Sequence, residues 1–123
     1  MTTTEVANKL VSFCRAGRFL DAVDALYDVD IVSVEARDNG DIPRELKGIQ
    51  AVRAKNLWWF ENHEVHGVSA AGPFVSPERF AVFFTFDHTF TGTGKRSQFS
   101  EVAVYTVSSG KIVHEEFLYG AEE

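Results

Sequence analysis

Residues 97–119 decide the fold, and they read SQFSEVAVYTVSSGKIVHEEFLY. Two runs rich in β-branched and aromatic residues flank the short segment Ser108-Ser109-Gly110, in which glycine can adopt the backbone conformation of a tight turn. The pattern predicts two antiparallel strands joined as a hairpin.

The first of these strands carries a carboxyl group on an apolar face. Because side chains alternate across a strand, one face carries Phe99, Glu101, Ala103 and Tyr105. A lone acid is costly to bury, so its place among apolar neighbours indicates a face that lines a cavity. Glu101 is therefore the first candidate for a functional residue.

The composition is that of one small globular domain. With 123 residues the chain can bury a core without disulfides or metal, and its one cysteine cannot form an internal disulfide. No amino-terminal segment has the apolar pattern of a signal peptide or a membrane span, so we expect a cytoplasmic protein. Asp and Glu outnumber Lys and Arg by 18 to 12 without any basic cluster, which argues against nucleic acid and anionic membranes as partners.

The amino-terminal quarter predicts two helices. Thr2 and Glu5 form a capping-box pattern, and apolar residues then recur at helical spacing until Gly17. A second, shorter helix is predicted from Phe19 to Leu26.

The middle of the chain predicts a strand, a polar connection and a third helix. The β-branched segment 31–36 is typical of a strand, and residues 37–47 are expected to cover one end of the sheet as a lid. A helix follows Gly48, and its expected apolar stripe consists of Ile49, Val52, Leu57 and Phe60.

Two more strands precede the hairpin. Residues 64–71 predict a strand that ends before Gly72-Pro73, and residues 79–91 predict a longer one on which Phe84, Phe86 and His88 share a face. The predicted fold is thus α+β: a single domain over residues 1–123, with three N-terminal helices packed on a curved, mostly antiparallel sheet.

Several motifs within residues 4–119 carry a resemblance to a known family: Leu26-Tyr27-Asp28, Gly48-Ile49-Gln50-Ala51-Val52, the strand from Glu101 to Val107, and Gly110-Lys111-Ile112-Val113. In this order they resemble the cone-shaped fold of nuclear transport factor two, ketosteroid isomerases and SnoaL-like polyketide cyclases. The ending Glu115-Glu116-Phe117 is similar to that of bacterial SnoaL-like proteins.

The resemblance implies roles for two acids. Placed against a ketosteroid isomerase, Glu35 matches the general base and Glu101 matches the protonated acid of the oxyanion hole. The oxyanion tyrosine of that family is replaced by an apolar residue near Leu10 or Phe13, which removes one donor. Limonene-epoxide hydrolases of the same fold use an Arg and an Asp on the long strand and a Trp and an Asp on the last one. The matching positions here are Phe84, Phe86, Glu115 and Phe117, so we do not expect epoxide hydrolysis.

Further residues are expected at the cavity. His88 could pair with an acid and shuttle a proton, or be a core histidine with satisfied hydrogen bonds. Glu115 shares a strand face with Phe117 and Tyr119, which the resemblance points inward, although Glu115 could instead lie at the rim in water. The expected ligand-contacting residues are Tyr105, Glu115, Tyr119, Phe84, Phe86, Phe99, Phe117, Trp58, Trp59 and His63.

Neither a metal nor a cofactor is expected. His63 and His66 span a helix-to-strand junction without a nearby cysteine, which is a poor zinc pattern. Cys14 falls on the apolar side of the first helix and is expected to be buried and unreactive.

Three functions remain open from the sequence. The first is cofactor-free proton abstraction next to a carbonyl of an apolar small molecule, with isomerisation, cyclisation or dehydration as the outcome. The second is non-catalytic binding of a hydrophobic small molecule in the same pocket. The third is an interaction domain: the fold commonly forms homodimers through the outer face of its sheet, which here carries Phe83, Thr85, Val102, Val104 and Thr106.

Overall fold

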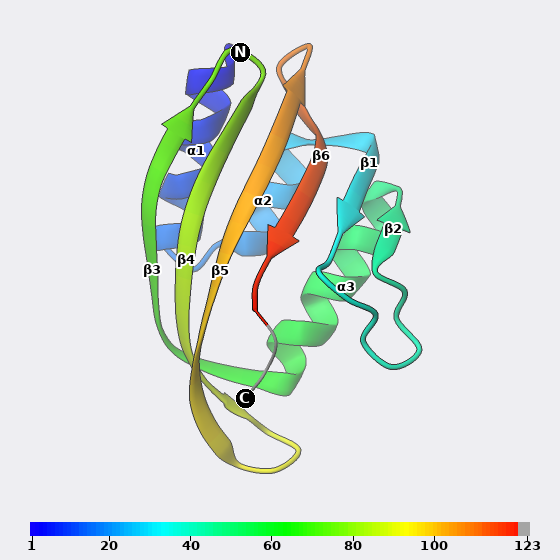
Figure 1. Cartoon of the computed structure of the whole chain (residues 1–123), viewed down its shortest axis with the longest axis vertical. Helices are drawn as coiled ribbons and strands as arrows, with labels where there is room; N and C mark the ends of the chain where they lie inside the picture. Colours follow the sequence, from blue (N-terminus) through cyan, green and yellow to red (C-terminus); the bar gives the residue numbers. More distant parts are fainter. Residues whose placement is uncertain (121–123) are drawn as a thin grey trace.

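The computed structural model describes residues 1–120, which form three helices and one curved sheet (Figure 1). The helices and strands are α1 (Thr3–Arg15), α2 (Phe19–Leu26), β1 (Tyr27–Val34), β2 (Glu45–Lys47), α3 (Ile49–Asn62), β3 (His63–Val75), β4 (Arg79–Phe90), β5 (Lys95–Ser108) and β6 (Lys111–Leu118). Figure 1 shows α1 and α2 against one side of the sheet and α3 across its lower end.

The sheet has six strands in the order β2-β1-β6-β5-β4-β3. All neighbouring strands are antiparallel except β1 and β6, which are parallel. The predicted α+β architecture, with a mostly antiparallel sheet and helices on one side, is therefore confirmed.

The β5–β6 hairpin forms as predicted and presents Glu101 to the helices. Its turn contains two residues with positive φ, Ser109 at 50° and Gly110 at 75°, which is the backbone form that suits a two-residue hairpin loop. Ala103 and Tyr105, on the same face as Glu101, are buried. No register shift interrupts the β4–β5 ladder from Arg79↔Thr106 to Phe90↔Lys95, so the alternation holds along β5.

The first helix also begins as predicted. The Thr2 hydroxyl accepts from the backbone N–H of Glu5 at 3.1 Å, and Glu5 accepts from the backbone N–H of Thr2 at 3.0 Å. This capping box satisfies two N–H groups that the helix itself leaves free.

Two strand boundaries differ from the sequence prediction. The first strand, predicted at 31–36, begins at Tyr27 and ends at Val34, because Tyr27 already pairs with Ile112 of β6. The strand predicted at 64–71 runs on to Val75, since β3 passes through a cis Gly72–Pro73 bond with a local register shift and resumes pairing at Phe74.

The connection and the third helix also differ from expectation. The segment predicted as a lid contains a short strand, β2, which pairs with β1. On α3 the predicted apolar stripe forms only in part: Val52 is fully buried and Ile49 packs against the core, but Leu57 is 39% exposed. The reason is that α3 lies over a cavity at the end of the sheet, while the core lies between the sheet and the other two helices.

That core consists of packed apolar side chains, most of them from α1, α2, β4 and β5, with further buried residues from α3, β1, β3 and β6. Its most buried members include Leu10, Leu26, Phe80, Val82 and Ala103. No helix within residues 1–120 is long and apolar enough to cross a membrane.

The hairpin turn yields a stability prediction. Replacing Gly110 by alanine puts a Cβ in a left-handed conformation and only 2.9 Å from the backbone nitrogen of Met1. We expect Gly110→Ala to lower the free energy of unfolding by about 1–2 kcal/mol. Gly67→Ala is the matched control, because Gly67 lacks a positive φ and a Cβ there meets open space. Equal denaturation midpoints for the two variants would contradict this account of the turn.

Candidate functional site

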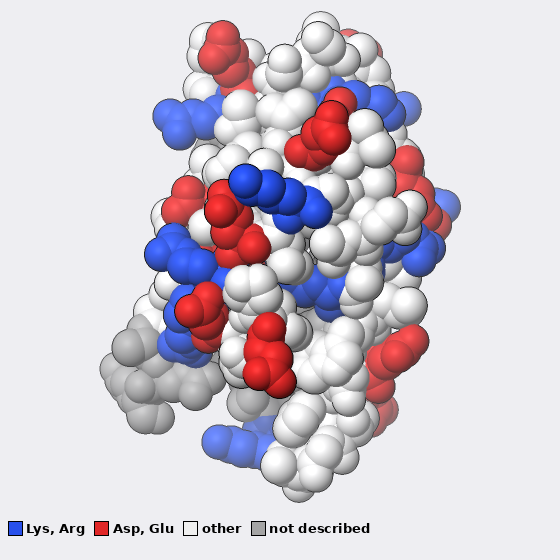
Figure 2. Space-filling model, turned by 90° about the vertical axis from the view of Figure 1, so that its right-hand side faces the viewer, with Lys and Arg blue, Asp and Glu red and all other residues white. Residues whose placement is uncertain are grey.

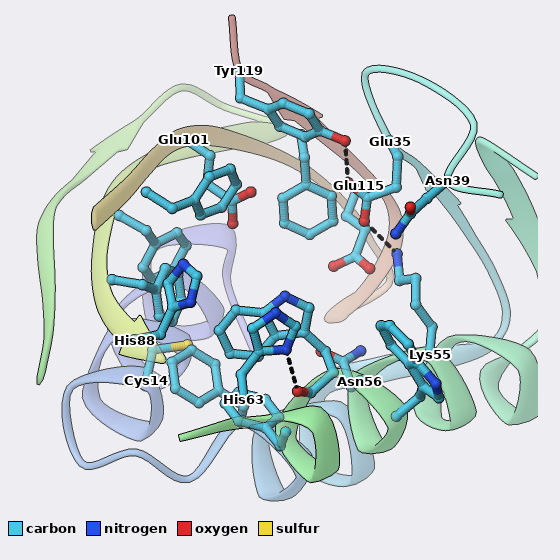
Figure 3. Close-up of a pocket in the computed structure, with 18 of the residues that line it drawn as sticks. Cys14, Glu35, Asn39, Lys55, Asn56, His63, His88, Glu101, Glu115 and Tyr119 are labelled. Atoms are coloured by element: carbon cyan, nitrogen blue, oxygen red, sulfur yellow. Dashed lines mark hydrogen bonds and ion pairs between the residues drawn. The ribbon is translucent and has the colours of Figure 1, made fainter. Parts of the chain in front are cut away.

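A cavity of about 670 Å³ lies between the concave face of the sheet and the helices (Figure 3). Its wall includes every residue that the sequence analysis assigned to catalysis or ligand contact. A volume of this size suits a small organic molecule. The chemistry of the cavity depends on how these side chains are paired.

Glu101 projects into the cavity from β5, opposite Phe84 of β4. Burial raises the pKa of its carboxyl group to about 8, and the negative charges of Glu35 and Glu115 contribute in the same direction. Lys55 opposes this shift. At neutral pH Glu101 is therefore mainly protonated and can donate a hydrogen bond.

Glu35 follows the end of β1 and is held by two partners. The Lys55 ammonium lies 2.9 Å from one carboxylate oxygen, and the Tyr119 hydroxyl donates to the other at 3.3 Å. Lys55 also donates to the Ser33 hydroxyl at 2.8 Å. Glu35 is thus one partner of a partly buried ion pair in the cavity wall.

The sequence analysis missed Lys55. A signal was present, because Lys55 precedes Trp59 by four residues and Trp58 by three, so all three share one side of a helix. The apolar stripe was the only criterion applied to this helix, and a lysine that pairs with an acid in the cavity does not meet it.

Glu115 is the most enclosed of the three acids, with 1% of its surface exposed. The structure therefore excludes the rim position that the sequence left open. The Tyr27 hydroxyl donates to its Oε1, while its Oε2 is buried without a partner. Burial raises the pKa of this carboxyl group, although the charge of Lys55 and the hydrogen bond from Tyr27 oppose the shift.

The pairing of Glu115 with Tyr27 could not be foreseen locally, because the two residues are 88 positions apart. Burial and the neighbouring negative charge of Glu115 raise the pKa of the Tyr27 hydroxyl well above its usual value. The phenol therefore stays protonated and acts as a donor.

Aromatic side chains form most of the remaining wall. The rings of Phe86 and Trp59 lie 5.6 Å apart, and Phe99 packs edge-on against Tyr119 at 5.5 Å. Trp58, 42% exposed, lies at the margin of the cavity. The other aromatic wall residues that the sequence identified are Phe84, Tyr105 and Phe117.

The two cavity histidines lie next to each other, and Figure 3 shows His88 across the cavity from Glu35. Their ring centroids are 5.1 Å apart, and the His63 ring stacks on Trp59 at 4.2 Å. Within residues 1–120 no hydrogen bond joins His88 to Glu35 or Glu101, and its Nδ1 has no partner, so the acid pairing that the proton-shuttle interpretation required is not formed. Burial lowers the pKa of His88, and nearby His63 adds to this effect.

Cys14 lies at the cavity floor beside Leu10, close to where the family resemblance would place a tyrosine. Burial raises the pKa of its thiol to about 12, so it has little thiolate character. Within residues 1–120 no group of three His, Cys, Asp or Glu side chains is placed to hold a metal ion.

The segment between β1 and β2 contributes Arg37, Asn39 and Ile42 to the cavity wall. The Arg37 guanidinium lies over the Tyr119 ring, 5.3 Å from its centroid. Figure 2 shows the side of the molecule that carries this segment, and acidic and basic side chains are interspersed over the described part of that face.

Comparisons with known proteins agree with the fold. The model of the SnoaL-like domain family matches residues 1–119. A crystal structure of a candidate SnoaL-like polyketide cyclase from Mesorhizobium loti is 40% identical, with a TM-score of 0.91 over 97% of this chain and 100% of the other. No curated protein is significantly similar to the chain in sequence.

More distant solved structures share the fold alone. A nuclear transport factor two-like protein from Anabaena variabilis has a TM-score of 0.75 at 14% identity, covering 98% of this chain and 90% of the other. A protein with a ketosteroid isomerase-like fold from Catenulispora acidiphila has a TM-score of 0.72 at 14% identity, covering 96% and 87%. The architecture is thus the cone-shaped fold that these proteins share. On the family match, the chain belongs to the SnoaL-like family.

The protonation of Glu101 predicts a pH-dependent stability. Its folded pKa of about 8 exceeds the ordinary value of 4.5, so the folded state binds an extra proton between these values and stability falls as the pH rises through that window. Glu101→Gln removes this contribution. We expect the stability of the variant relative to the wild type to rise by about 2 kcal/mol from pH 5 to pH 8, a value reduced for solvent screening in the open cavity.

Chemical denaturation across this pH range is the measurement. Ser100→Ala, on the outer face of the same strand, is the control and should keep the wild-type pH dependence. Parallel curves for Glu101→Gln and the wild type would show that the carboxyl group is not protonated in the folded state.

Proposed function

We propose that the cavity catalyses cofactor-free proton abstraction next to the carbonyl of a hydrophobic small molecule. The observation that carries the proposal is the inward carboxyl group of Glu101, whose pKa is raised to about 8. It faces a cavity that also contains the Glu35 carboxylate. Two acids in different protonation states are the arrangement that acid–base chemistry at neutral pH requires.

The step assigns one role to each acid. Glu35 accepts the proton as the C–H bond next to the carbonyl breaks, and the electron pair moves to form an enolate. The developing negative charge on oxygen accepts a hydrogen bond from protonated Glu101. Return of the proton to another carbon, or attack by the enolate carbon on a second carbonyl, gives isomerisation or cyclisation respectively.

Similarity to the Mesorhizobium loti protein, a candidate polyketide cyclase, supports a substrate with ketone groups and fused or fusible rings. The aromatic wall supports the same class, because flat ring systems stack well on such surfaces. The proposal includes a cytoplasmic location, which a single cysteine supports.

One observation favours the alternative of non-catalytic binding. Both carboxylate oxygens of Glu35 already have partners, Lys55 and Tyr119. A base in this state must exchange one partner for the substrate before it can accept a proton. In a binding protein the same pair would only set the polarity of the wall.

Exchange of the α-hydrogens of polycyclic ketones in D2O, followed by NMR, separates the two functions. We expect the wild type to catalyse exchange, Glu35→Gln to slow it at least ~100-fold, and Glu101→Ala to slow it about 100- to 1000-fold. The rate should fall as the pH rises through about 8, where Glu101 loses its proton. Glu116→Gln, on the outer face of the sheet, is the control.

Two results would contradict catalysis by these acids. Exchange that is undiminished in Glu35→Gln removes Glu35 as the base. If ketones bind to the wild type but their α-hydrogens do not exchange, non-catalytic binding is the function that remains.

The proposal also includes a homodimer formed through the outer face of the sheet. Phe74, Phe83 and Leu118 are 64%, 44% and 49% exposed in the single chain. Val102 and Val104 lie between them on β5, where Phe83 pairs with Val102 and Leu118 pairs with Val102 from the other side. A second copy of the same face would remove these apolar side chains from water.

Sedimentation velocity at micromolar concentration tests the dimer. We expect the wild type to sediment as a dimer and Phe83→Glu as a monomer, because the substitution places a charge in the centre of the proposed interface. Leu57→Glu, at a similarly exposed apolar residue on α3, should remain dimeric. A monomeric wild type would rule the interface out.

A further inference from the structure

Two buried side-chain atoms within residues 1–120 lack a hydrogen-bond partner, namely Oε2 of Glu115 and Nδ1 of His88. Both residues belong to the wall of the same cavity. Buried polar groups in proteins are almost always paired, so these two unpaired atoms mark Glu115 and His88 as wall residues whose polar groups the protein itself leaves incompletely satisfied.

These two positions lie at different ends of the cavity. His88 follows Phe84 by four residues on the same face of β4, and Phe84 lies opposite Glu101. At about 3.3 Å per residue the level of Glu101 and the level of the imidazole are separated by about 13 Å along the sheet. Glu115 lies still further from His88, because it is opposite Tyr105, four residues beyond Glu101 on β5. Figure 3 shows His88 on the opposite side of the cavity from Glu35 and Lys55.

The hydrogen-bonding character of the imidazole end follows from His63. Its Nδ1 lies 2.8 Å from the carbonyl oxygen of Trp59, and a carbonyl can only accept, so Nδ1 carries the hydrogen. In the neutral ring Nε2 is then an acceptor. Burial lowers the pKa of His88 and so favours its neutral ring, which offers one donor and one acceptor.

A hydroxyl group matches this end better than a carboxylate does. A hydroxyl can donate to Nε2 of His63 and accept from the N–H of His88. A carboxylate needs donors only, and two donors would be available only after an imidazole gained a proton, which burial opposes.

The wall between the two ends is aromatic. Phe86 lies between Phe84 and His88 on the inner face of β4, and Trp59 packs against both Phe86 and His88 at 5.6 and 5.5 Å. Phe99 completes this section from β5, 6.4 Å from Phe86. Such a wall suits a flat, rigid body of fused rings.

We propose that the ligand is an elongated polycyclic ketone with a hydroxyl group at its far end, which the His63–His88 pair binds. The placement of the ketone at Glu101 rests on the proposed function. The placement of the hydroxyl group at His63 and His88 rests on the geometry of the two imidazole rings alone.

Three probes that differ at one position test the proposal. Testosterone carries a ketone and a hydroxyl at opposite ends of a rigid four-ring body, androst-4-en-3-one lacks the hydroxyl, and androst-4-ene-3,17-dione replaces it with an acceptor. Binding is measured by quenching of tryptophan fluorescence, since Trp58 and Trp59 line the cavity. We expect testosterone to bind the wild type about tenfold more tightly than the deoxy compound, with the dione in between.

The variants His88→Phe and His63→Phe should each reduce the ratio of the affinities for testosterone and for androst-4-en-3-one to about one. Glu35→Gln should preserve this ratio. Circular dichroism confirms that each variant is folded. A ratio near one in the wild type, a ratio unchanged in both histidine variants, or no binding of any of the three probes would overturn the proposal.

The readout is independent of turnover. If the wild type shows the hydroxyl preference but does not catalyse α-hydrogen exchange, the catalytic function fails while the two-ended ligand stands. If exchange occurs without a hydroxyl preference, the two-ended ligand fails while the catalytic function stands.

Discussion

The site depends on the cost of placing carboxyl groups in a cavity walled by aromatic rings. Water is replaced there by apolar surface, which disfavours the charged form of each acid. The three acids meet this cost differently: Glu35 pairs with Lys55, Glu115 accepts from Tyr27, and Glu101 keeps its proton. Their different environments are therefore a consequence of the fold around them.

The fold makes this arrangement possible because α3 crosses the end of the sheet without packing tightly onto it. The core between the other two helices and the sheet provides the stability. That leaves α3 free to present Lys55, Trp59 and His63 to a cavity. Stability and chemistry are thus located in neighbouring but separate parts of one small domain.

The sequence predicted the parts of the site that lie on regular strands. Glu101 was placed correctly because β5 pairs with β4 without a bulge, so alternation alone determines its face. Lys55 was missed because an apolar-stripe criterion applies to core-facing helices, and the pairing of Tyr27 with Glu115 depends on a contact between residues 88 positions apart. The extension of β3 through Gly72–Pro73 was missed because such a pair usually ends a strand.

The protonation state of Glu101 is the claim on which the proposed chemistry rests, and carbon-13 NMR of labelled glutamate carboxyl groups measures it directly. Comparison of the wild type with Glu101→Gln assigns the resonance. We predict that this carboxyl group titrates near pH 8. A midpoint near 4.5, the ordinary value, would show that Glu101 is ionised at neutral pH and cannot donate a hydrogen bond to an enolate oxygen.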